Sequence, residues 1–137
     1  MRSMAAASVP AMRAAGRGAI VNVASIHAVA TLEGFFPYGA AKAGLVGLTR
    51  NMALDYGPWG IRANAVCPGF IDSPWFDKHG TPGTVDFLRQ HMASNNPLKA
   101  YSTPEDVAGS ALFLASPAAR HVTGETLLVD AGMHLNG

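Results

Sequence analysis

Three short apolar runs along the chain have the composition of buried β-strands. Residues 19–24, AIVNVA, follow a glycine and are β-branched and apolar almost throughout, which is typical of a strand buried on both faces of a parallel sheet. Residues 61–69 form a second run that ends in Pro-Gly, and residues 124–130 form a third. The pattern therefore predicts three strands.

Between these runs the apolar residues recur every three or four positions, which is the spacing of a helix. Residues 37–56 carry such a set, which GPWG then ends: Leu45, Leu48, Met52 and Tyr56. Residues 102–117 predict another helix, with Thr103 as its N-cap and Pro104 at its first position. Strands that alternate with helices predict an α/β fold, in which a parallel sheet is joined by crossover helices.

The first residues, MRSMAAASVPAMRAAGRGA, allow two interpretations. They contain arginines and serines but no acid, as transit peptides do. They also fit a short helix that Pro10 would kink, and they continue directly into the first strand. We favour the helix because of this continuity.

Residues 70–101 show no sustained period and carry the turn sequence GTPG. One weak helix, residues 85–94, is predicted to interrupt this irregular region. Because the region is aromatic and follows a strand end, it is the candidate lid of a site.

The bulk composition excludes several classes of protein. The 137 residues are 49% hydrophobic and 14% charged, with a net charge of +1, so we expect one domain, 1–137, that binds neither nucleic acid nor a membrane. Cys67 is the only cysteine, which excludes an internal disulfide and suits a reducing, cytoplasmic compartment. The histidines show no metal-ligand spacing, so we expect no catalytic metal.

The sequence YGAAK places a phenol and an ammonium group four residues apart in a predicted helix. Such positions lie on one helix face, and the small residues between them leave that face open. A lysine beside a tyrosine favours the phenolate, which suits acid–base chemistry near neutral pH. Pairs like Tyr38 and Lys42 also arise by chance, as a core tyrosine and a solvated lysine, so the pair alone does not decide the function.

Five motifs in order make the chain similar to the C-terminal half of a short-chain dehydrogenase/reductase. Tyr38 and Lys42 match the family's Tyr-x-x-x-Lys, and Ser25, thirteen residues earlier at a strand end, matches its catalytic serine. The stretches NAVCPGFIDS, PEDVAGSALFLAS and VTGETLLVDAG match the nicotinamide segment, the closing helix and the closing strand. The resemblance covers essentially the whole chain and implies half of a doubly wound, Rossmann-like domain.

The resemblance implies an NAD(P)-dependent oxidoreductase that interconverts a small-molecule ketone or aldehyde and an alcohol. Tyr38 would be the general acid in reduction and the base in oxidation, and Lys42 would assist it through its charge. Both residues would also contact the cofactor, with Lys42 hydrogen-bonding the ribose. Ser25 would donate a hydrogen bond to the substrate oxygen, and the nicotinamide would supply hydride. The choice between NAD and NADP stays open, because the family's selector residues lie upstream.

The segment after the second strand would contact the cofactor, as the family suggests. Pro68 and Gly69 would let the backbone approach the nicotinamide. The main chain of Ile71 and the hydroxyl of Ser73 would hold its carboxamide, with Ser73 standing where the family often has threonine.

For the substrate the residues support only weaker predictions. His27, Phe70 and Trp75 could line a pocket, although a loop histidine without a role and aromatic packing explain them equally well. Asn22 and Asn64 lie within predicted strands and are interpreted as structural groups that satisfy the backbone.

The glycine-rich phosphate loop of the family is not found in this sequence. We therefore expect the N-terminal phosphate-binding half to be absent and the chain to be a fragment or a truncated product. Half a sheet exposes the edge of the strand at 19–24, so we expect a homo-oligomer or pairing with an N-terminal half. The alternative to an active enzyme is an inactive remnant that serves as an oligomerisation or interaction module.

Overall fold

A three-stranded parallel sheet forms the centre of the protein. The computed structural model describes residues 4–81 and 83–136. The strands are β1 (Gly18–Val23), β2 (Ile61–Pro68) and β3 (Thr126–Val129), in the spatial order β1-β2-β3. The predicted α/β class and the parallel sheet are confirmed.

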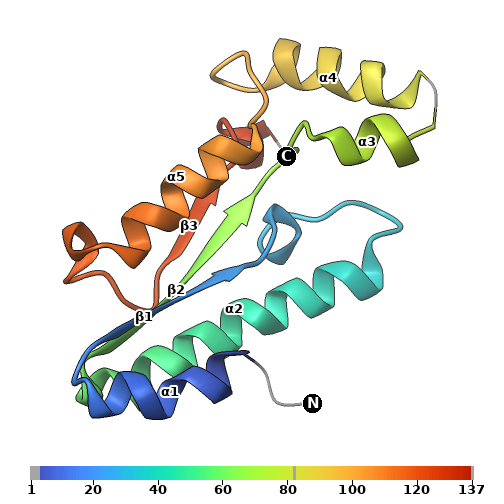
Figure 1. The fold of residues 1–137 in the computed structure, drawn as a ribbon. Coiled ribbons are helices and arrows are strands. Elements are labelled where there is room, and N and C mark those ends of the chain that lie inside the picture. The colour runs from blue at the N-terminus through green and yellow to red at the C-terminus, as the bar shows by residue number, and fades with distance from the viewer. Residues whose placement is uncertain (1–3, 82, 137) are drawn as a thin grey trace.

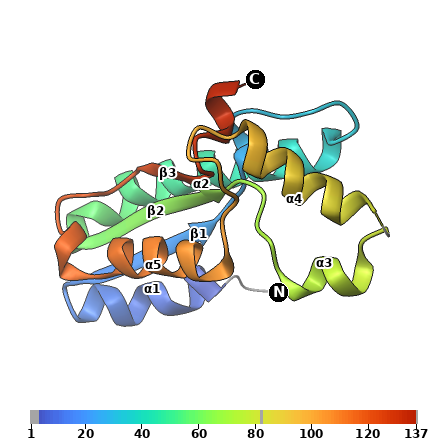
Figure 2. The ribbon, with the colours of Figure 1, turned by 90° about the horizontal axis from the view of Figure 1, so that it is seen from above.

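Helices cover both faces of this sheet. Figure 1 shows α1 (Met4–Ala14) and α2 (Phe36–Tyr56) on one face and α5 (Pro104–Ala115) on the other. Two more helices, α3 (Pro74–His79) and α4 (Thr84–Asn95), lie beyond the carboxyl ends of the strands (Figure 2). The helix favoured for the N-terminal residues is α1. Within the described ranges, no helix is long and apolar enough to cross a bilayer.

The middle of β2 is the most deeply buried part of the sheet. From Ala63 to Cys67 every residue is completely covered, because β2 has a strand on either side and helices on both faces. On the α2 face, two clusters of buried residues follow the length of the sheet, one near its carboxyl end and one near its amino end. This packing holds the carboxyl ends of β1 and β2 in place.

The two strand asparagines have different partners. The Asn64 side chain donates to the carbonyl of Val122 and accepts from the N–H of Glu125, so it satisfies the backbone as predicted. The same expectation for Asn22 is wrong, because its amide donates to the hydroxyl of Thr49 in α2 at 2.9 Å. Asn22 thus joins β1 to α2 through side chains.

The prediction that the strand at 19–24 is buried on both faces is wrong. β1 is an edge strand in the described structure, where it pairs with β2 alone. Ile20 is its only buried residue, and Val23 is 52% exposed. An apolar composition shows that a strand can be covered on both faces, but the covering itself depends on neighbouring elements. The open edge agrees with the exposed edge expected from the sequence.

The irregular region at 70–101 contains two helices where the sequence predicted one. α4 covers the predicted 85–94 and extends one residue beyond it at each end. α3 was missed because six residues are too few to display a helical period, and so short a helix depends on its tertiary contacts.

Candidate active site

A cavity of about 660 Å³ lies beyond the carboxyl ends of β1 and β2. In parallel α/β sheets this end is where ligands bind. Every residue predicted for the site whose side chain is described lines this cavity: Ser25, His27, Tyr38, Lys42, Pro68, Gly69, Phe70, Ile71 and Ser73. Trp75 lies in α3, and its side chain falls outside the described residues. The fold thus brings segments that are distant in sequence to one place.

Ser25 lies at the junction between β1 and a short 3-10 helix, Ile26–Ala28, for which it is the N-cap. Its Oγ accepts a hydrogen bond from the N–H of His27 at 3.3 Å, and the residue is 6% exposed. Because Oγ acts as the acceptor in this bond, the hydroxyl hydrogen can still be donated to a ligand.

Tyr38 and Lys42 lie one turn apart near the start of α2. Nζ of Lys42 is 5.6 Å from the centre of the Tyr38 ring and donates a 3.0 Å hydrogen bond to the carbonyl of Val23, at the end of β1. This bond anchors the ammonium group between helix and strand. An ammonium group has three N–H donors, so two remain for a ligand.

In the segment after β2, the backbone N–H and C=O of Ile71 take no part in the hydrogen bonds to Ser102. The N–H of Asp72 donates to the carbonyl of Ser102, and the N–H of Ser102 donates to the carbonyl of Phe70. Successive residues of an extended chain direct their backbone groups to opposite sides. The N–H and C=O of Ile71 therefore face away from Ser102, and Ile71 lines the cavity. One donor and one acceptor are the complement that a carboxamide needs.

The imidazole of His27 packs among aromatic rings at the mouth of the site. It stacks on Phe35 at a centroid distance of 4.2 Å and meets the edge of Tyr38 at 5.7 Å. Its Nδ1 lies 3.2 Å from the hydroxyl of Thr31. Burial lowers the pKa of His27, which favours the neutral ring. The structure therefore brings His27 to the tyrosine, which sequence alone left undecided.

Several apolar residues that line the cavity were not predicted. They come from the loop before α2, from α4 and from the C-terminal turn: Leu32, Phe35, Leu88, Met92 and Met133. Leu88 and Met92 are four residues apart, so the sequence could have placed them on one helix face. Nothing in the sequence shows that α4 lies over the ends of β1 and β2.

A larger cleft, of about 780 Å³, lies at the opposite, amino-terminal ends of the strands. Arg17, Arg62 and Arg120 line it, but none of the predicted catalytic residues does. The guanidinium of Arg62 donates to the carbonyls of Leu114 and Ser116 at the end of α5, which is a structural role. We therefore assign the candidate active site to the smaller cavity.

Gly69, at the end of β2, packs directly against Asp130. A Cβ at position 69 would lie 2.7 Å from the Cβ of Asp130 and 3.0 Å from its Cα. Gly69→Ala should therefore push the backbone at position 69 away from Asp130. This overpacking should lower the free energy of unfolding by about 1–3 kcal/mol. Urea denaturation measures this change.

Gly44→Ala in α2 is the matched control for Gly69→Ala. Nothing lies within 4 Å of a Cβ built there, so helix propensity should raise the free energy of unfolding by up to about 1 kcal/mol. Equal destabilisation by both substitutions would contradict the packing assigned to Gly69.

Acid should weaken the fold through His27. Because burial lowers its pKa below 6.5, the folded protein binds this proton less readily than the unfolded chain. The contribution to stability is complete above pH 6.5 and is lost as the pH falls through the folded-state pKa. Urea midpoints from about pH 8 to about pH 5 should fall, and His27→Gln should reduce this slope. An identical slope in both proteins would refute the assignment.

Comparison with known proteins identifies the family of this chain. The family model described as enoyl-(acyl carrier protein) reductase matches residues 1–134. The chain belongs to the short-chain dehydrogenase/reductase family. It is 46% identical over 121 residues to a cis-4-hydroxycyclohexanecarboxylate dehydrogenase of Sinomonas cyclohexanicum, covering 88% of this chain and 47% of that protein.

Solved structures of short-chain dehydrogenase/reductases share the fold. An oxidoreductase of the family from Burkholderia thailandensis superimposes with a TM-score of 0.83 at 43% identity, over 94% of this chain and 49% of that one. A gluconate 5-dehydrogenase from Burkholderia cenocepacia J2315, solved with NADP and tartrate, has a TM-score of 0.83 at 29% identity over the same shares. The chain spans about half the length of these relatives and so contains part of the family's Rossmann-like domain.

Proposed function

We propose that the chain carries the catalytic part of an NAD(P)-dependent oxidoreductase that interconverts a ketone or aldehyde and an alcohol. The observation that supports this most is the meeting of Ser25, Tyr38 and Lys42 at one cavity beyond the strand ends. Relatives named as dehydrogenases, one of them solved with NADP, support the same reaction class.

In the reducing direction Tyr38 gives its proton to the substrate oxygen, and in oxidation the phenolate takes it back. Ser25 donates its hydroxyl hydrogen to that oxygen as negative charge builds, while the N–H of His27 fixes the position of Oγ. The ammonium group of Lys42 is held by the carbonyl of Val23 and stays 5.6 Å from the centre of the Tyr38 ring, next to the proton donor.

The residues of the cavity fit a nicotinamide cofactor, which supplies or accepts the hydride when it is bound. The outward-facing N–H and C=O of Ile71 and the hydroxyl of Ser73 hold its carboxamide, and the two remaining N–H groups of Lys42 hold a ribose hydroxyl. Pro68 and Gly69 shape the backbone beside them. Either NAD or NADP suits this set.

The substrate is a small carbonyl compound or alcohol with an apolar part. His27 and Phe70 lie on the substrate side of the site in this proposal. Leu88 and Met92 reduce the access of water to the reacting atoms. The protein acts in the cytoplasm as a homo-oligomer or joined to an N-terminal half, without nucleic acid or membrane.

The test is turnover with and without a phosphate-binding half. NADH and NADPH oxidation is followed by absorbance with a panel of ketones and aldehydes, first for the chain alone and then with the N-terminal half of the Burkholderia thailandensis relative added. Turnover in either case supports the proposal. If calorimetry detects no binding of either cofactor in both cases, the enzymatic function is wrong for this polypeptide. The open edge of β1 then favours the interaction module.

A further inference from the structure

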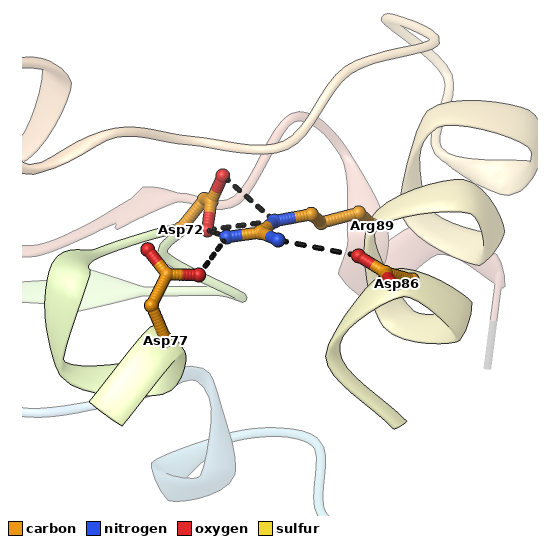
Figure 3. Close-up of polar contacts among 4 residues, drawn as sticks. All are labelled: Asp72, Asp77, Asp86 and Arg89. Atoms are coloured by element: carbon orange, nitrogen blue, oxygen red, sulfur yellow. Dashed lines mark hydrogen bonds and ion pairs between the residues drawn. The ribbon is translucent and has the colours of Figure 1, made fainter. Parts of the chain in front are cut away.

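Arg89 in α4 is surrounded by three carboxylates from three parts of the chain (Figure 3). Its Nε and Nη2 donate to Asp72 over distances of 2.8–3.1 Å, and Nη2 also donates to Asp77 at 2.8 Å. Nη1 donates to Asp86 at 3.3 Å. Asp72 follows β2, Asp77 lies in α3 and Asp86 lies in α4 itself. The guanidinium therefore connects three segments of the region 70–101.

The three ion pairs differ in their shielding from water. The side chain of Asp72 is 21% exposed, that of Asp77 is 60% exposed and that of Asp86 is 82% exposed. Exposed pairs contribute little, whereas a forked guanidinium–carboxylate pair that is partly covered is both stronger and more directional. The hydrogen bonds that Arg89 donates to Asp72, and then the one that it donates to Asp77, raise the pKa of its guanidinium. The Asp72 pair is therefore the dominant one.

This pair joins two walls of the candidate active site. Asp72 lies between Ile71 and Ser73, which line the cavity from the segment after β2. Arg89 lies in α4 next to Leu88, which lines the same cavity together with Met92. The backbone N–H of Asp72 is already bonded to the carbonyl of Ser102. The ion pair with Arg89 therefore ties α4 to a segment that is itself held in place.

We propose that Arg89 is a positioning residue, whose bond to Asp72 holds α4 at the cavity and keeps Leu88 and Met92 in the same lining as Ile71 and Ser73. Its importance for turnover rests on the proposed function, whereas the mechanical link between α4 and the segment at 70–73 does not. Breaking the link should free α4 from the strand ends and leave the β-sheet intact.

Hydrogen exchange followed by mass spectrometry tests the link in the chain itself, without cofactor or substrate. Asp72→Asn should speed exchange in 70–73 and 84–95 about tenfold, because the bond that it weakens is charge-assisted and partly covered. Asp86→Asn is the matched control, since it removes the same charge beside Arg89 but joins no second segment, and its effect should stay within about twofold. Arg89→Lys keeps the positive charge but loses the paired hydrogen bonds of the guanidinium. Its effect on the exchange rate should lie between those of Asp72→Asn and Asp86→Asn.

Equal effects of Asp72→Asn and Asp86→Asn would overturn the proposal. So would faster exchange spread equally over β2 and α2, because that would mark general destabilisation. If Asp72→Asn does not fold, the exchange rates of Arg89→Lys and Asp86→Asn in 70–73 and 84–95 are compared instead. Equal rates in these two variants would overturn the proposal.

Kinetics in the reconstituted enzyme test the positioning role. Asp72→Asn should raise the KM for the carbonyl substrate about tenfold and change kcat by less than about threefold, since the proton donor is untouched. A loss confined to kcat would overturn the positioning role. If the reconstituted wild-type protein shows no turnover, the proposed function fails while the exchange result still stands.

Discussion

Tyr38→Phe should lower kcat of the reconstituted enzyme about a thousandfold. The substitution keeps the aromatic ring beside His27 and removes only the hydroxyl that transfers the proton. The contacts proposed for the cofactor, at Lys42, Ile71 and Ser73, are unchanged, so the dissociation constant for NADPH or NADH should change less than about threefold. Steady-state absorbance assays give kcat, and calorimetry gives the dissociation constant.

Tyr56→Phe is the matched control because it removes the same atom from the same helix. Tyr56 ends α2, where its ring stacks on Trp59 at 5.6 Å, and it does not line the cavity. Its substitution should leave kcat unchanged. The role of Tyr38 would be refuted if Tyr38→Phe kept more than about a tenth of the activity, or if both variants lost it equally.

Leu114→Ala should lower the free energy of unfolding by about 3 kcal/mol. Leu114 is 1% exposed and lies on the inward side of α5, which packs on all three strands. Truncating this side chain removes buried apolar surface and leaves a cavity that the sheet can close only in part. Urea denaturation, with the slope m as a check on two-state behaviour, measures the loss.

Leu112→Ala, two residues away in α5, gives the matched control. Leu112 is 71% exposed, so the same truncation there should change the free energy of unfolding by less than about 0.5 kcal/mol. If both variants lost equal stability, α5 would not present the face assigned here to the sheet.

Features governed by neighbours in the chain were predictable from the sequence. Thr103 caps α5 as expected, and it forms a reciprocal pair with Asp106, in which each side chain accepts from the other's backbone N–H. The spacing of Tyr38 and Lys42 required that they share a helix face, and they do. Capping and helix periodicity act over three or four residues, so they need no tertiary information.

Features governed by distant neighbours were not predictable. The apolar residues of β1 have the composition of a central strand, yet within the described residues the strand lies at the edge of the sheet, where Ile20 is its one buried residue. The short α3 has no period of its own to detect. Asn22 was expected to bond the backbone but found Thr49 across the sheet–helix interface.

The sequence by itself determined the order of the three strands and of every α-helix except the short α3, the family, and which side chains could do acid–base chemistry. Only the tertiary structure decided that Leu88, Met92 and Met133 enclose those side chains, that Ile71 turns its amide away from Ser102, and that Arg89 joins two walls of the site. The physical reason is the sequence distance over which each interaction acts. Local propensities depend on neighbouring residues, whereas packing and ion pairing depend on which remote segments meet beyond the strand ends.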